Sequence, residues 1–138
     1  MAVLAQARRD EIEQGLHAAT VPIDFVELRA AECGLIMLRG RIGGDGAPFN
    51  LGEATVTRAM VRIDSGETGI GYILGRDPER ARLTALCDAL WQNDSYRAAI
   101  DRCVLAPVRG RIEAERDQRR RRTAATRVDF LTLVRGED

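Results

Sequence analysis

The fold class is decided by residues 54–78, which read ATVTRAMVRIDSGETGIGYILGRDP. Small or apolar side chains alternate with other residues from Ala54 to Ile63, and this period of two predicts a long β-strand. The Asp-Ser-Gly sequence at 64–66 predicts a tight turn. A return strand follows, with apolar side chains at alternate positions: Ile70, Tyr72 and Leu74. The stretch therefore predicts an antiparallel pair of strands.

The end of the same stretch predicts a packed sheet followed by a helix. Gly69, Gly71 and Gly75 weaken the return strand, and glycine inside a strand is typical of a place where another element approaches closely. Asp77 followed by Pro78 matches the N-cap and first position of a helix. We therefore expect a helix that begins immediately after the strand.

Residues on the N-terminal side predict one helix and a further hairpin. The helix is expected within residues 1–20, where Asp10 and Glu13 match a capping-box pattern. Residues 25–42 show strand-like alternation on both sides of residues 32–34. This pattern predicts a β-hairpin that turns at residues 32–34.

Three helices are predicted over residues 78–123. The first carries an apolar stripe that should face the core: Leu83, Leu86, Cys87, Leu90 and Trp91. The last has few apolar residues beyond Ile112 and carries the oppositely charged pairs Glu115–Arg119 and Asp117–Arg121, each four residues apart. We expect this last helix to be a solvent-exposed helix or a spacer.

Residues 127–135 alternate apolar and polar side chains, which predicts either a last strand of the sheet or an apolar arm that needs a partner. The residues expected at such an interface are Arg127, Asp129, Phe130, Leu131 and Arg135. Together the segments predict a single domain over residues 1–138 of the α+β class. Its antiparallel, hairpin-built sheet spans residues 25–75, and its helices pack on one face of the sheet.

The composition limits the chemistry of the 138 residues. All 21 basic residues are arginines and 21 residues are acidic, so a zero net charge removes the usual attraction to nucleic acid or anionic membranes. Without lysine, no Schiff-base or Walker A lysine is available. A Ser-His-Asp triad would have to use His17, the one histidine, which lies in a helical context. The remaining groups can bind a polyanion but are poorly suited to starting a covalent reaction alone.

The three cysteines predict no metal site. Cys33, Cys87 and Cys103 show no C-x-x-C spacing, and zinc ligation by them with His17 is formally open but lacks the paired, closely spaced ligands of most zinc sites. No signal peptide and no apolar run of membrane-spanning length is recognisable. We therefore expect a cytoplasmic protein with reduced thiols and no membrane partner.

The most unusual stretch is the glycine-rich loop expected over residues 43–52. Successive glycines can present backbone N–H groups to an anion, and nearby arginines can add charge. The candidate anion- or partner-binding residues here are Arg41, Gly43, Gly44, Asp45, Gly46 and Arg58. The loop matches neither phosphate-loop signature, since no Lys-Ser/Thr follows and Pro48 interrupts the approach to a helix. The alternative is a long, mobile hairpin connection.

Two further basic features are candidates. Arg76 and Asp77 stand where a strand meets a helix N-terminus, which could bind an anion, although Asp77 could serve as a helix cap alone. Four arginines at 119–122 could be a solvated helix end, a partner-docking site or a nucleic-acid site. The last of these lacks interleaved aromatic residues for base stacking.

The sequence resembles a known family along most of its length. Residues 41–62, residues 75–77 and the ending at 127–138 match, in order, the G subunit (PhnG) of the bacterial phosphonate carbon–phosphorus lyase system. Each piece alone is weak, but three in order, with the last at the C-terminus, make a specific match.

The resemblance implies membership of a core complex with the H, I and J subunits. With the H, I and L proteins, a member of the family supports transfer of a phosphonate to the ribose C1′ of ATP, with release of adenine. MgATP and the phosphonate are then substrates of the complex, and the chain alone binds no cofactor. We expect a non-catalytic or co-catalytic subunit rather than an enzyme by itself.

Three hypotheses remain open for the molecular role. The chain could be a scaffold for its neighbours, or it could complete a neighbour's active site through Arg41, Asp45, Arg58 or Arg76. The third is a nucleic-acid-binding or other small interaction module that uses residues 119–122.

Overall fold

The computed structural model describes residues 2–126. A three-stranded sheet and a set of helices form an α+β fold, which confirms the predicted class. The elements in chain order are η1 (Leu4–Gln6), α1 (Arg9–Ala19), β1 (Val26–Arg41), β2 (Pro48–Arg62), β3 (Thr68–Leu74), α2 (Pro78–Gln92), α3 (Asp94–Ile100), the π-helical turn η2 (Asp101–Leu105) and α4 (Ala106–Ala125).

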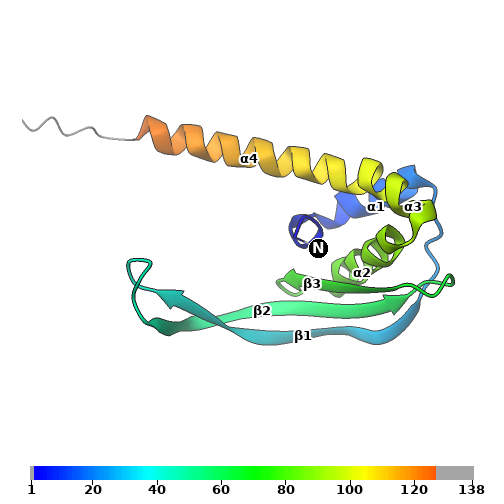
Figure 1. Cartoon of the computed structure of the whole chain (residues 1–138), viewed down its shortest axis with the longest axis horizontal. Helices are drawn as coiled ribbons and strands as arrows, with labels where there is room; N and C mark the ends of the chain where they lie inside the picture. Colours follow the sequence, from blue (N-terminus) through cyan, green and yellow to red (C-terminus); the bar gives the residue numbers. More distant parts are fainter. Residues whose placement is uncertain (1, 127–138) are drawn as a thin grey trace, which may run out of the picture.

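The sheet is antiparallel in the order β1-β2-β3, and the helices lie on one side of it (Figure 1). Thr57, Ala59 and Val61 alternate along β2 on the side that the helices cover, and all three are buried. Ile70 and Tyr72 of β3 lie on the uncovered face and are exposed. The predicted strands and the turn between them are therefore confirmed. The predicted alternating residues Ile70, Tyr72 and Leu74 lie on the outer face, whereas Ile73 between them is buried in the core.

Helix α2 packs closely against β3 because two glycines leave room for it. A Cβ atom on Gly69 would overlap the carbonyl oxygen of Ala85, and one on Gly71 would overlap that of Ala81. The close approach expected from the glycines is thus confirmed, and the bulky neighbour is the backbone of α2. Asp77 caps this helix as predicted, because its Oδ1 accepts a hydrogen bond from the Arg80 backbone N–H at 3.0 Å.

The hairpin predicted within residues 25–42 is wrong. The residues expected to turn lie inside the continuous strand β1, where Cys33 pairs with Thr57 and Gly34 with Val56. Irregularities of register occur at Glu27–Glu32, so the chain bends there without reversing. A turn would have forfeited the long ladder with β2, which β1 needs to satisfy its backbone groups.

The expected loop at 43–52 is also shorter than predicted. The connection between β1 and β2 covers residues 42–47, and residues 49–52 already belong to β2. Gly52, which has a positive φ of 157°, lies within β2 and pairs with Leu38. Pairing with β1 therefore extends β2 through residues 48–52, which were expected in the loop.

The predicted helix caps and ion pairs differ in detail. The N-terminal helix has its capping box at Arg8 and Glu11, two residues earlier than predicted, and the Arg8 backbone N–H donates to the Glu11 carboxylate at 2.8 Å. The pairs predicted for residues 115–119 and 117–121 are not formed. Glu115 instead accepts from Arg111 and Arg8, and the nearest arginine to Asp117 is Arg120, at 3.9 Å. Glu115 thus turns toward the base of the helix, where it contacts Arg111 and also Arg8 of the N-terminal segment.

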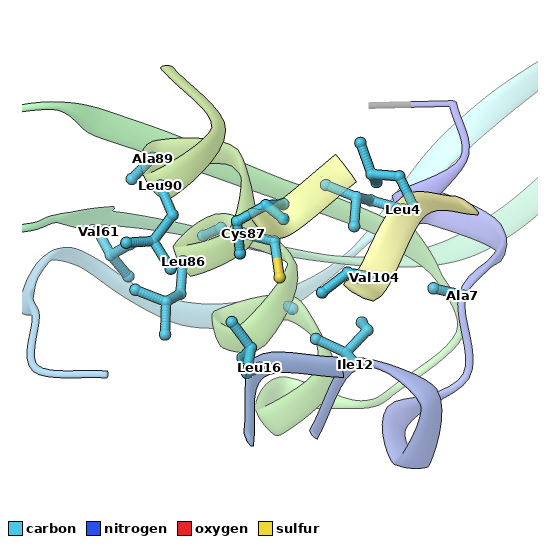
Figure 2. Close-up of a cluster of buried hydrophobic side chains, with 14 of the residues drawn as sticks. Leu4, Ala7, Ile12, Leu16, Val61, Leu86, Cys87, Ala89, Leu90 and Val104 are labelled. Atoms are coloured by element: carbon cyan, nitrogen blue, oxygen red, sulfur yellow. The ribbon is translucent and has the colours of Figure 1, made fainter. Parts of the chain in front are cut away.

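Trp91 was predicted to face the core but is 41% exposed. Its ring lies at the end of α2, where the guanidinium carbon of Arg97 stands 5.3 Å from the ring centroid. The core beneath α2 is built by smaller side chains, of which Leu86 and Leu90 pack between the sheet and the α1 residues Ile12 and Leu16 (Figure 2).

Cys87 lies in this core, and burial raises the pKa of its thiol to about 12. Cys33 is exposed and Cys103 is partly buried, and all three cysteines are free thiols in the structure. None of the helices described is long and apolar enough to cross a membrane. The predicted strand or arm at 127–135, with its interface residues, lies outside the described residues.

Candidate functional site

The corner between β3 and α2 is organised by the buried side chain of Thr57. Its Oγ1 donates a hydrogen bond to the Gly75 carbonyl oxygen at 2.6 Å and accepts one from the Asp77 backbone N–H at 3.2 Å. Gly75 has φ 94°, a conformation that favours glycine, so the chain can turn from the strand into the helix. One threonine therefore fixes both ends of the turn.

The two candidate residues at this corner have different surroundings. The carboxylate of Asp77 is occupied as the cap of α2. Arg76 is exposed. Arg80 braces the turn from the other side, with Nη2 donating to the Leu74 carbonyl oxygen at 2.7 Å. Arg76 is therefore the cation that this corner offers to a ligand or to a neighbouring chain.

The glycine-rich segment forms the tip of the β1–β2 hairpin. Gly43 and Gly44 have φ values of 63° and 85°, and the Gly46 backbone N–H donates to the Ile42 carbonyl oxygen at 3.1 Å. Asp45 is exposed at this tip. The glycines thus make a tight reversal.

The structure does not bring the tip and the corner together. Arg41 pairs with Pro48 at the base of the tip, whereas the Gly75 N–H donates to the carbonyl oxygen of Thr55. Seven strand residues separate Pro48 from Thr55, which corresponds to about 23 Å. The eight candidate residues therefore occupy separate places instead of lining one pocket.

Arg58 lies in a third place, on the face of the sheet that carries no helix. Its Nε donates to Glu32 at 2.7 Å, and Arg29 approaches the same carboxylate at 2.9 Å. The hydrogen bond from Arg58, helped by the charge of Arg29, lowers the pKa of Glu32 below its ordinary value. Arg58 is thus already paired within the chain.

The base of α4 is fastened to the N-terminal segment by an arginine that the sequence did not single out. Arg111 pairs with Glu11, with Glu115 at 3.1 Å and with the Gln6 carbonyl oxygen at 2.8 Å. Burial disfavours the charged form of Glu11, but the hydrogen bonds from Arg111 and Arg8 outweigh it and lower the pKa of Glu11. These contacts fix the direction in which α4 leaves the core.

Beyond this base the helix stands free of the rest of the described chain. Every residue from 113 to 126 is exposed, and this segment contains the arginine run at 119–122. In the described part of the chain, Arg116, Arg119, Arg121 and Arg122 form no ion pair within 4.0 Å. The sequence indicated an exposed basic helix, and the structure adds that it projects.

The β1–β2 hairpin projects as well, and it is apolar. β3 pairs with β2 from Val56 to Arg62 only, so the hairpin continues past it as a two-stranded ribbon. Exposed apolar residues on this ribbon are Leu35, Met37, Leu38, Ile42, Phe49 and Leu51. Their alternation in the sequence signals a strand, but only the extent of β3 reveals that nothing in the described chain covers them.

A groove of about 810 Å³ lies between the end of α1 and helix α2. Its lining is mostly apolar and includes Leu16, Val21, Phe25, Leu83 and Leu86, together with His17. No metal-binding group of three or more His, Cys, Asp or Glu side chains occurs within residues 2–126. The described surface thus offers cations and apolar strips for binding.

Comparison with known proteins identifies the family to which the chain is similar. Residues 1–136 match the family model described as "Phosphonate metabolism protein PhnG". A protein of Rhizobium meliloti (strain 1021), the "Alpha-D-ribose 1-methylphosphonate 5-triphosphate synthase subunit PhnG", is 48% identical over 138 residues. That alignment covers 100% of this chain and 88% of the relative.

Proposed function

The chain belongs to the PhnG family of phosphonate metabolism proteins, and we propose that it is a subunit of an α-D-ribose 1-methylphosphonate 5-triphosphate synthase. The identity of 48% with a named subunit of that synthase, along the full length of this chain, carries the proposal. The complex would transfer a phosphonate to the ribose C1′ of ATP and release adenine. Its partners would be the H, I and J subunits, with the L protein in the transferase step, in the cytoplasm.

The contribution of this chain would be support of the reaction. ATP carries a triphosphate, and the phosphonate is a second anion, so their approach needs fixed cationic donors. Arginine is the only basic residue that this chain could supply, apart from His17. The phosphonate oxygen would attack C1′ and displace adenine, while the general acid or base and the metal would come from a neighbouring subunit, where MgATP and the phosphonate bind.

The exposed arginines at two places would be the donors nearest to a neighbour's site. Arg76 stands free at the corner before α2, and Arg41 lies at the base of the hairpin tip with Gly43, Gly44, Asp45 and Gly46 beyond it. Because Arg58 is held by Glu32, it would contribute less. The two places would serve separate contacts, as they are about 23 Å apart.

Reconstitution of the complex tests the function. The H, I and L proteins, with MgATP and methylphosphonate, should release adenine only when this chain is added, and the chain alone should release none. Equal release without it would refute the proposed function. Arg76→Ala should lower turnover and leave assembly intact, with Arg62→Ala, an exposed arginine at the far end of β2, as the matched control.

A further inference from the structure

We propose that this chain holds one partner subunit between two projecting arms. The helical arm is residues 113–125 of α4, and the ribbon arm is residues 35–41 of β1 paired with residues 48–55 of β2. The partner presents carboxylates to the helical arm and an apolar ridge to the ribbon arm. This inference deepens the proposed function and rests on it.

Register places two exposed apolar side chains on the inner side of the ribbon arm. Cys33 pairs directly with Thr57, which is buried under the helices, so both lie on the helix-covered side of the sheet. Leu35 and Met37 follow Cys33 at alternate positions and share that side. They are 62% and 51% exposed because α2 begins at the corner beside Thr55 and runs away from them. The face that forms the core farther along the sheet thus continues, uncovered, along the ribbon arm.

Helical periodicity places two arginines on the inner side of the other arm. Ile112 is buried against the core, and Arg116 and Arg119 follow it by four and seven residues on the same face of α4. Arg121 follows by nine residues and points to the opposite side of the helix. The core-facing stripe of α4 therefore becomes a basic stripe once the helix has left the core.

Both arms extend from the core in the same direction, with α4 on the helix-covered side of the sheet (Figure 1). A partner that lies between them meets Arg116 and Arg119 on one side and Leu35 and Met37 on the other. Neither arm is supported by the described chain. A two-stranded ribbon and a single polar helix are each marginally stable in water, so a partner that covers them also stabilises them.

The charge of the helical arm identifies the chemistry of the partner. The arm carries five arginines, at 116 and 119–122, against Glu113, Glu115 and Asp117, and Glu115 is already paired with Arg8 and Arg111 at the base of the helix. A second copy of this chain would bring an equally basic helix and be repelled, whereas carboxylates on another protein would pair with the arginines. The arm has no aromatic side chain on which nucleic-acid bases could stack, which favours a protein.

Matched substitutions on opposite faces test the inference in the assembled complex. The full chain is co-expressed with the other synthase subunits, and the dissociation constant of each variant for them is compared with that of the wild type. Arg119→Glu is tested with Arg121→Glu as its control. Leu35→Ser is tested with Leu74→Ser as its control. Leu74 is 64% exposed but lies on the uncovered face of the sheet. Circular dichroism confirms that each variant is folded.

We expect Arg119→Glu and Leu35→Ser each to weaken binding by about tenfold or more, since both side chains are desolvated in the complex. Arg121→Glu and Leu74→Ser should stay within about twofold. Equal effects within either pair would overturn the placement of the partner between the arms, while the complex itself and the proposed function would stand. If the wild-type chain does not bind the other subunits, the proposed function fails and the inference fails with it. Self-association abolished by Leu35→Ser, or binding of an RNA oligomer abolished by Arg119→Glu, would overturn the partner's identity.

Discussion

Replacement of Thr57 by valine should destabilise the fold far more than the same change at Thr84. Both threonines are fully buried, and valine keeps the shape of the side chain at each position. The hydroxyl of Thr57 makes the hydrogen bonds to Gly75 and Asp77 that fix the corner before α2. The hydroxyl of Thr84 has no hydrogen-bond partner within the described chain.

The magnitude follows from what each substitution leaves behind. Thr57→Val leaves a carbonyl and an N–H group without their partner, at a cost of about 1–2 kcal/mol each, so the free energy of unfolding should fall by about 2–4 kcal/mol. Thr84→Val removes a buried hydroxyl that gains nothing from its surroundings. It should leave the free energy of unfolding unchanged or raise it by about 1 kcal/mol.

Urea unfolding followed by circular dichroism measures both values. With a slope of about 2 kcal/mol per M for a chain of this size, the midpoint of Thr57→Val should fall by about 1–2 M and that of Thr84→Val should not fall. A loss of equal size in both variants would refute the reasoning. It would mean that the methyl–hydroxyl exchange itself, and not the two hydrogen bonds of the corner, sets the cost.

Three further outcomes are expected. Gly71→Ala should destabilise the fold by about 2 kcal/mol or more in urea, because its Cβ meets the backbone of α2, whereas Gly34→Ala, with open space around it, should cost less than about 0.5 kcal/mol; similar costs would contradict the packing. A disulfide reagent at pH 8 should label Cys33 rapidly and Cys87 only upon unfolding, since burial raises the pKa of Cys87 to about 12; rapid labelling of both would show that the core opens. The pKa of Glu11 is lowered in the folded state, so its contribution to stability is present above the ordinary pKa of 4.5 and is lost as the pH falls through the folded value. Glu11→Gln should therefore reduce the fall in the free energy of unfolding at acid pH, as measured by urea unfolding. An unchanged fall would refute the role of Glu11.

The elements that could be predicted are those whose signals are local. Asp77 and Pro78 define the start of α2 because capping depends on groups within one turn. Gly69 and Gly71 could be interpreted as places of close approach because only glycine lacks the atom that would collide there. In each case the cause lies within a few residues of the observed effect.

Errors arose where distant partners decide the outcome. The turn predicted at residues 32–34 is instead part of β1, because pairing with β2 over its full length stabilises the extended chain. Trp91 fits the apolar stripe of α2, yet it lies at the end of the helix, outside the core. Glu115 pairs with Arg8 and not with Arg119, which requires knowing where the N-terminal segment lies.

In the candidate site, too, features with a local signal could be predicted and features that depend on distant contacts could not. Sequence reasoning found the residues that carry exposed charge, such as Arg76 and Arg119, because composition and spacing reveal them. It could not show that the hairpin tip and the corner are separated, since that depends on how far β3 extends along β2. The uncovered strip at Leu35 and Met37 was missed for the same reason.

A zero net charge does not describe the electrostatic field that a partner meets. Several acidic residues outside α4 are paired with arginines, as in Arg111–Glu11, Arg82–Glu27 and Arg58–Glu32, so these carboxylates have little influence at a distance. The helical arm extends about 20 Å past residue 112, whereas charges in physiological salt are screened within about 8 Å. Carboxylates outside α4 are therefore too far away to neutralise the arginines at 119–122. An acidic surface that approaches α4 is attracted as it would be to a basic peptide, and the composition of the whole chain has little influence on that attraction.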